Sequence, residues 1–209
     1  MNTLFPTLPA PADLQIGSVQ PSRLSVSQSM KRSVRTTGAQ LWTLKARWAP
    51  LTRSQFAPIQ AFVLAQRGRA GVFTWRTPLY PAPIGVATGT PVVTGAGQTG
   101  TLLMTSGWSP SVPGILKAGD VFSIAGQPKV YMVMEDANSN SNGESILSIQ
   151  PSLLISPAAA APLTVNHVPF TLSLSSDLME AKITKGALFQ GEHPYGLLFS
   201  FALELIEAI

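Results

Sequence analysis

The sequence lacks cysteine and is poor in charged residues. Without cysteine, the chain has no disulfides, no thiolate metal sites and no cysteine nucleophile. Charged residues make up 11% of the 209 residues, against roughly a quarter in typical soluble domains. Because a surface with so little charge is a poor barrier to association, we expect a component of an assembly and not a freely diffusing enzyme.

The sequence also lacks the patterns of export and membrane insertion. No basic segment followed by an apolar run opens the chain, and no uninterrupted apolar stretch is long enough to cross a bilayer. We therefore expect synthesis in a cytoplasm without a Sec-type signal, and no membrane insertion. The net charge is +4, but dense blocks of lysine and arginine are missing, which argues against specific nucleic-acid recognition.

The segment from Ala39 to Arg76 has the pattern of a strand, a helix and a second strand. Apolar residues alternate with polar ones at its start, which is the period of a half-buried strand; they are Trp42, Leu44, Ala46 and Trp48. We expect Pro50 to end this strand. A second strand is expected from Val72 to Trp75, so the helix between them would return along the sheet.

The helix itself is predicted by its end signals. Thr52 and Gln55 have the spacing of a capping box, and Gly68 supplies the left-handed residue at which helices stop. Apolar residues fall at helical spacing between these signals. The sequence therefore predicts one helix over about 53–67, with Pro58 inside its first two turns, where the cost is smallest.

Proline-rich segments at 77–83 and 157–162 mark two domain boundaries. Short strands separated by turn residues fill the region between them; they are Val92–Val93, Thr101–Met104, Val121–Ile124, Val130–Met134 and Ile146–Ile149. A last alternating strand begins near Leu197 and is expected to pair with the first eighty residues. We therefore predict a mainly β fold: a discontinuous β-sandwich domain with one α-helix, formed by 1–82 with 163–209, and a small β-barrel or sandwich domain inserted at 83–162.

Two motifs suggest ligand binding at first sight. Gly95, Gly97 and Gly100 form a GxGxxG pattern with Asp120 twenty positions later, but the following residues have the pattern of a strand and not of the helix that dinucleotide binding needs. The loop DANSNSNGE from Asp136 resembles the start of a calcium loop, but it lacks the glycine at the sixth position and the acid at the twelfth. A turn and a polar hairpin tip are the simpler interpretations.

The residues for catalysis are sparse. His167 and His193 both lie in turn-like contexts, GxSxG is absent, and the few acids are scattered. We expect neither an enzyme nor a cofactor or metal. Among the tryptophans, Trp42, Trp48 and Trp75 are expected in the core, whereas Trp108, within SGWSP, is the candidate for an exposed contact.

The segment LWTLKARWAPLTRSQFAPIQAFVLAQRGRAGVFTWRTP resembles the N-terminal domain of distal tail proteins of long-tailed, non-contractile bacteriophages. In that family, a tryptophan-containing strand, a proline-ended turn, an amphipathic helix and a glycine-led phenylalanine strand recur in this order. The segment ILKAGDVFSIAGQPKVYMVMEDANSNSNGESILSIQPSLL also resembles a phage tail module, with its AGD-F, K-VY and late Ile-x-Pro elements. Together the two segments cover roughly four-tenths of the chain, and their motifs are structural.

The resemblance implies a structural virion protein of the tail tip. It implies a homohexameric ring between the tail tube protein and the baseplate hub protein, with a channel for DNA and the tape-measure protein. The inserted domain would project toward receptor-binding or tail fibre proteins. The proline-rich segment 1–21 would become ordered against a neighbouring subunit. Arg53, Gln60 and Arg67 on the helix, with Trp108, are the expected interface residues.

The residues leave two alternatives open. A carbohydrate-binding β-module of a phage or bacterial surface protein would present Trp108 on a concave face, and a hydrolase would need a pocket with perturbed acids. A ring protein instead predicts a closed, symmetric oligomer with head-to-tail contacts.

Overall fold

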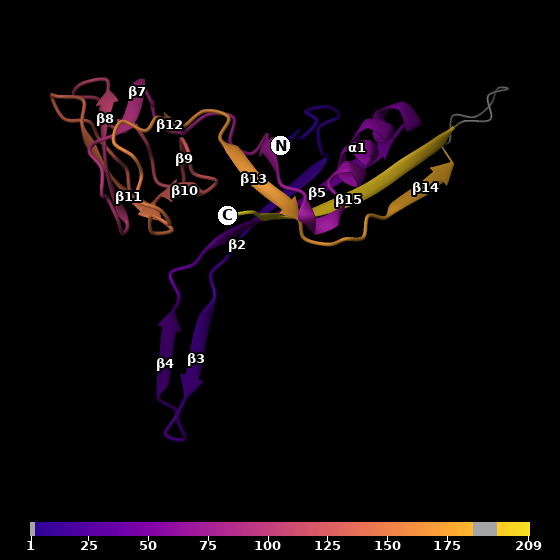
Figure 1. Cartoon of the computed structure of the whole chain (residues 1–209), viewed down its shortest axis with the longest axis horizontal. Coiled ribbons are helices and arrows are strands. Elements are labelled where there is room, and N and C mark those ends of the chain that lie inside the picture. Colours follow the sequence, from indigo (N-terminus) through magenta and orange to yellow (C-terminus); the bar gives the residue numbers. More distant parts are fainter. Residues whose placement is uncertain (1–2, 186–195) are drawn as a thin grey trace. The chain divides into compact units, whose positions relative to one another are not determined.

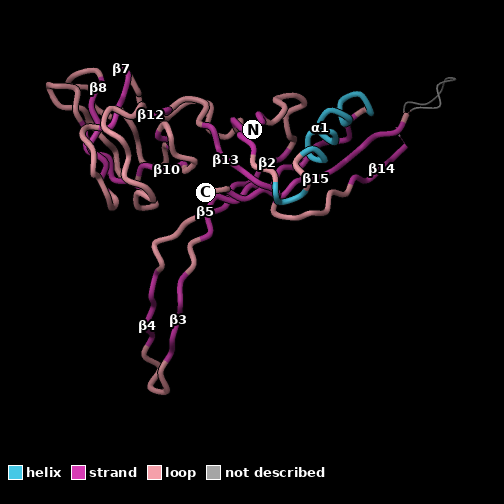
Figure 2. Tube along the Cα trace, in the orientation of Figure 1, coloured by secondary structure: helices cyan, strands magenta, loops and turns pink. Residues whose placement is uncertain are grey.

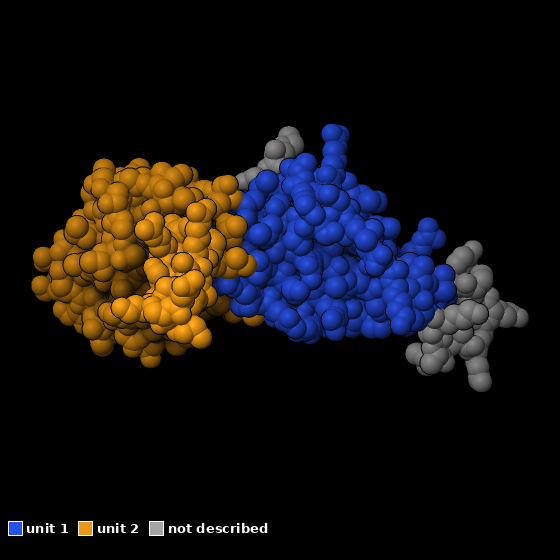
Figure 3. Space-filling model, turned by 90° about the horizontal axis from the view of Figure 1, so that it is seen from below, with its two compact units in different colours: residues 1–18, 42–76, 171–208 blue, residues 19–41, 77–170, 209 orange. Residues whose placement is uncertain are grey.

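The computed structural model describes residues 3–185 and 196–209 (Figure 1). By packing, the chain divides into two compact units, coloured separately in Figure 3. The first unit consists of 1–18, 42–76 and 171–208, and the second mainly of 19–41 and 77–170. This division places residues 19–41 in the second unit, whereas the sequence analysis assigned them to the terminal domain. The division into a ring-forming domain and an inserted domain stays a prediction.

A seven-stranded sheet forms the first unit. Its strands are β1 (Thr3–Leu4), β2 (Asp13–Val19), β5 (Leu41–Leu51), β6 (Phe73–Arg76), β13 (Pro169–Leu174), β14 (Ala181–Lys185) and β15 (Leu197–Glu207). The order is β1-β6-β13-β15-β5-β2, and β14 also pairs with β15. The last strand is the centre of this sheet, since β5, β13 and β14 all pair with it antiparallel. This confirms the expected pairing of the two ends of the chain.

One α-helix, α1 (Arg53–Ala65), is present in the described part of the chain and follows β5 directly. At its start the backbone N–H of Thr52 donates to Oε1 of Gln55 at 3.0 Å, as the capping-box spacing predicts. Arg67 and Gly68, at φ of 56° and 69°, are left-handed and end it. The prediction for Pro50 was wrong by one residue, because β5 continues through Leu51 before the helix begins.

Aromatic side chains fill the interior between α1 and the sheet. The ring of Phe5 contacts Trp48, Phe62, Phe73 and Trp75, with centroid separations between 4.8 and 6.0 Å. The N-terminal segment is therefore part of its own core, with β1 paired in parallel with β6. The expectation that this segment needs a neighbouring subunit to become ordered is wrong for residues 3–5.

A nearly closed β-barrel forms most of the second unit. Its strands are β7 (Gly89–Val93), β8 (Leu102–Trp108), β9 (Val121–Ile124), β10 (Val130–Val133), β11 (Ser145–Gln150) and β12 (Leu163–Thr164), in the order β12-β9-β10-β11-β8-β7. Strand β7 closes the barrel against the segment just before β12. The N–H of Val93 donates to the carbonyl of Ala161, and the N–H of Ala160 donates to the carbonyl of Val93. The mainly β fold with one helix and a small barrel is confirmed.

A third, two-stranded sheet consists of β3 (Ser22–Val26) and β4 (Arg32–Thr36), shown as a hairpin in Figure 2. We call residues 22–36 the arm. Every residue of both strands is exposed. The arm thus has no buried face of its own within the described chain.

Candidate interaction surfaces

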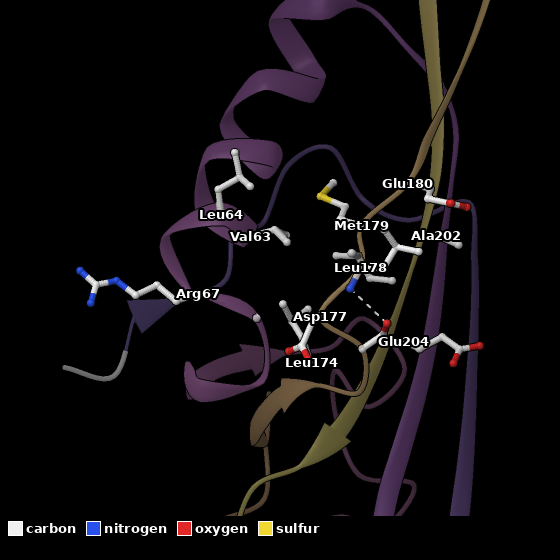
Figure 4. Close-up of a pocket in the computed structure, with 13 residues that line it drawn as sticks. Val63, Leu64, Arg67, Leu174, Asp177, Leu178, Met179, Glu180, Ala202 and Glu204 are labelled. Atoms are coloured by element: carbon white, nitrogen blue, oxygen red, sulfur yellow. Dashed lines mark hydrogen bonds between the residues drawn. The ribbon is translucent and has the colours of Figure 1, made fainter.

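A groove with a cavity volume of about 640 Å³ lies in the first unit (Figure 4). It is lined by three segments that are distant in the sequence: the end of α1, the connection from β13 to β14, and the middle of β15. Leu64 and Leu178 line it and remain well exposed. An accessible hollow with an apolar lining is typical of a surface that receives side chains of another molecule.

The groove is also acidic. Asp177, Glu180 and Glu204 line it, against a single basic residue, Arg67. Glu204 lies 2.8 Å from Nζ of Lys45 and Asp177 lies 3.8 Å from Nε of Arg69, but these side chains are largely exposed. These pairs partly neutralise Glu204 and Asp177, so Glu180 is the lining acid without an ion pair among the residues that the structure describes.

The arm carries an apolar face. Its register places Leu24 directly opposite Val34, and Val26 opposite Arg32, on the same side of the hairpin. Met30 at the turn is 83% exposed. Leu24 and Val26 alternate with polar residues in the sequence, but this pattern alone does not show that the hairpin stays without a packing partner among the described residues.

A second apolar surface lies on the outside of the barrel. Met104 of β8 is paired with Ile146 of β11, and Leu102 is the neighbouring exposed residue on β8. Met134 follows β10, and its N–H donates to the carbonyl of Ser148. These four exposed apolar side chains form a patch.

Trp108 is buried, so the prediction that it lies on the surface was wrong. It is 3% exposed, and its indole N–H donates to Oγ1 of Thr105 at 2.9 Å. The turn residues around it end β8 and direct the ring into the barrel core. A sugar-stacking platform at Trp108 is therefore excluded.

Of the other expected interface residues, Arg53 and Gln60 lie on α1, whereas Arg67 follows it, because the helix ends at Ala65 and not at the predicted residue 67. Arg53, Gln60 and Arg67 are all exposed, and Arg67 also lines the groove. Their role in an interface stays a prediction.

The sequence analysis missed the acids of the groove, because Asp177 and Glu180 stand in an irregular connection with no motif around them.

The GxGxxG segment forms a turn. Gly95, Gly97 and Gly100 all have φ between 75° and 83°, and the segment joins β7 to β8. Asp120 has a different role from the acid of a dinucleotide site. Its carboxylate accepts hydrogen bonds from the backbone N–H groups of Ile84, Gly85 and Lys117 at 2.6, 3.0 and 2.7 Å. The acid is a structural anchor of the barrel.

The polar loop from Asp136 to Glu144 uses its side chains to hold backbone. Asp136 accepts from the N–H of Ala118, and Asn138 accepts from that of Gly114. Asn140 accepts from the N–H groups of Asn142 and Glu144. The oxygens that the sequence suggested for calcium are thus engaged in turns.

Within residues 3–185 and 196–209, no group of three or more histidine and acidic side chains could hold a metal ion. His167 has a left-handed backbone, and its N–H donates to the carbonyl of Pro81. His193 lies outside the described residues. No helix in that part of the chain is long and apolar enough to cross a membrane.

Comparison with known proteins identifies the barrel. Residues 81–168 match the family described as the B domain of the distal tail protein pb9, and this range contains all six barrel strands. A search among curated proteins found no match to the chain. The match covers the segment ILKAGDVFSIAGQPKVYMVMEDANSNSNGESILSIQPSLL, in which the resemblance to a phage tail module was noted. Residues 81–168 are therefore similar to a domain of the phage distal tail proteins, which supports a structural protein of the phage tail.

Proposed function

We propose that the chain forms a hexameric ring at the tail tip. The ring joins the tail tube protein to the baseplate hub protein, leaves a channel through which DNA passes, and gives attachment to receptor-binding or tail fibre proteins. The protein is made in the cytoplasm of the bacterial host, needs no cofactor and is not an enzyme.

One observation carries this proposal. The barrel that matches the distal tail family is inserted into a separate unit, whose central strand β15 comes from the end of the chain and whose neighbour β5 comes from its beginning. A unit built in this way can hold a fixed place in a ring while the inserted barrel is displayed to other proteins. The scarcity of charge supports extensive contacts between subunits.

The chain offers the two kinds of surface that a ring needs. A closed ring with rotational symmetry uses head-to-tail contacts, in which two different surfaces of each copy meet. The arm and the groove are two such surfaces on one chain. A dimer with an isologous interface would instead need only one self-complementary surface.

The experiment is to measure the mass of the purified protein at several concentrations, by native mass spectrometry and light scattering. We expect a closed species of six protomers of 22.1 kDa each, either alone or after addition of the tail tube protein of the same phage. Electron microscopy of stained particles checks that this species is an annulus. A protein that stays monomeric with and without the tail tube protein contradicts the proposal.

The carbohydrate-binding alternative required an exposed Trp108. Trp108 is in the core of the barrel, so it offers no face to a sugar ring. A glycan array probed with the whole protein tests the remaining possibility. Binding that competes with assembly would favour a surface-binding module over a ring component.

A further inference from the structure

No other element that the structure describes packs on the arm. A two-stranded hairpin alone is at best marginally stable in water, and all side chains of β3 and β4 are exposed. The face with Leu24, Val26 and Val34 would remain in contact with water unless another surface covers it. The arm is therefore an element whose stability depends on a contact outside its own two strands.

The charge of the arm narrows the choice of contact. Residues 22–36 contain four basic residues and no acid; they are Arg23, Lys31, Arg32 and Arg35. Arg23 stands directly opposite Arg35 across the hairpin, and like charges in this position destabilise a strand pair. These two arginines lie on the face opposite to Leu24 and Val34, and Arg32 is the basic residue on the apolar face. A partner with a carboxylate would pair with Arg32, whereas an uncharged apolar surface would not.

The groove has the complementary properties. It combines exposed apolar side chains, Leu64 and Leu178, with the carboxylate of Glu180, which has no ion pair among the described residues. Arg32 lies on the same face of the arm as the apolar pair Leu24 and Val34. One face of the arm therefore presents both apolar side chains and a positive charge.

We propose that the arm of one copy binds in the groove of a second copy, with Leu24, Val34 and Met30 against the apolar lining and Arg32 beside Glu180. The contact joins two different surfaces of identical chains, so it can repeat around a ring. This inference rests on the proposed ring, and it names the pair of surfaces that joins neighbouring subunits.

The absence of cysteine makes a direct test possible. One variant carries Met30→Cys at the arm turn, and another carries Leu178→Cys in the groove, where that side chain is 69% exposed. The two proteins are mixed under assembly conditions, with the tail tube protein where it is needed, and are oxidised. Because each chain has one thiol, a disulfide between arm and groove joins two different chains. We expect this heterodimer as the main cross-linked product.

A matched control uses Ile146→Cys, which places an exposed thiol on the outside of the barrel. Mixing it with Met30→Cys should give far less heterodimer than mixing Leu178→Cys with Met30→Cys. Equal yields from both mixtures would overturn the proposal. So would a cross-link that forms only when both cysteines are in one chain, because the arm would then occupy the groove of its own copy.

Charge reversal gives a second, independent readout. Arg32→Glu should weaken assembly about tenfold and make it less sensitive to salt, since an attractive pair becomes repulsive. Adding Glu180→Arg to the same chain should restore assembly, whereas adding Glu135→Arg, an exposed acid outside the groove, should not. Circular dichroism checks that the variants fold, which is expected because both side chains are exposed.

The two proposals fail in distinguishable ways. If Arg32→Glu and a variant lacking residues 22–36 still form a closed hexamer, the ring stands and the arm–groove contact is wrong. If the unmodified protein forms no ring with or without the tail tube protein and the mixture gives no cross-link, both fail. A specific cross-link within an open or smaller oligomer would retain the contact and reject the hexamer.

Discussion

The carboxylate of Asp120 lies 2.6 Å from the backbone nitrogen of Ile84, and the two residues are 36 positions apart. The same carboxylate also accepts from Gly85 and from Lys117 in its own turn. Asp120 is 3% exposed, so these hydrogen bonds replace its lost hydration. The segment that enters the barrel is thereby fixed to the turn before β9.

Asp120→Ala should destabilise the barrel strongly. The substitution removes three charge-assisted hydrogen bonds and leaves three backbone donors without their acceptor, at a cost on the order of 3 kcal/mol or more. Urea unfolding followed by far-ultraviolet circular dichroism measures the free energy of unfolding. Asp136→Ala is the control, because Asp136 is exposed and accepts from a single N–H group, that of Ala118. Equal losses in the two variants would refute the anchoring role of Asp120.

Trp108→Ala should destabilise the barrel and should not act through a ligand. Removal of a buried tryptophan costs roughly 3–5 kcal/mol. Trp108→Phe retains much of the apolar volume and loses the hydrogen bond to Thr105, so we expect a loss of roughly 1–2 kcal/mol. Thermal unfolding of both variants checks this order. A fully stable Trp108→Ala variant would mean that the side chain is not in the core.

Gly143 is required by a close approach of two backbones. Its φ is +72°, and a Cβ atom at this position would collide with the carbonyl oxygen of Trp108. We expect Gly143→Ala to cost more than about 3 kcal/mol, because the backbone of β8 has to move. Gly97→Ala is the matched control: its φ is +79° but its Cβ would meet no atom within 4 Å. That variant should lose about 1 kcal/mol, and a similar loss at both positions would contradict the close approach.

The strands of the barrel could be predicted from the sequence because turn residues separate them clearly. The strands predicted at Val121–Ile124 and Val130–Met134 agree with β9 and β10 to within one residue. The two-residue strand β12 was missed, since Leu163 and Thr164 are too few to show a period. In the first unit, β5, α1 and β15 were predicted for the same reason: long periodic patterns with recognisable end signals.

The groove could not be predicted, because it depends on how three distant segments meet. Leu64, Leu178 and Glu204 come from a helix, a connection and a strand, and no spacing in the sequence relates them.

The burial of Trp108 could not be predicted for a different reason. Neighbouring turn residues indicate exposure, but a strand that ends in a turn can still direct its last side chain inward, and only the closed barrel decides the side.

Tyr80 is expected to make the stability of the protein fall at alkaline pH. Burial raises the pKa of its phenol above the ordinary value of 10.0, and the ring stacks on Phe170. Between the unfolded and the folded pKa, the folded protein keeps a proton that the unfolded chain has lost. The free energy of unfolding therefore falls as the pH rises from about 10 through the folded pKa.

The test compares the unmodified protein with Tyr80→Phe, which retains the ring and removes the titrating group. Unfolding in urea at about pH 9 and about pH 11 gives the change in stability for each. We expect the unmodified protein to lose more stability than the variant over this interval. An identical loss would show that other groups alone cause the alkaline destabilisation.

Phe5 tests whether the N-terminal segment belongs to the core of the first unit. Its ring is 2% exposed and contacts four other aromatic rings of the cluster, from β5, α1 and β6. Phe5→Ala should cost roughly 3–5 kcal/mol. Leu4→Ala is the control, because Leu4 is the adjacent residue but is 55% exposed, and it should change stability by less than about 0.5 kcal/mol. The measurement is made on the dissociated protein, so that a contact with a neighbouring subunit cannot contribute. Full stability of the Phe5→Ala protein, with loss only of its assembly, would instead place this segment against a neighbour.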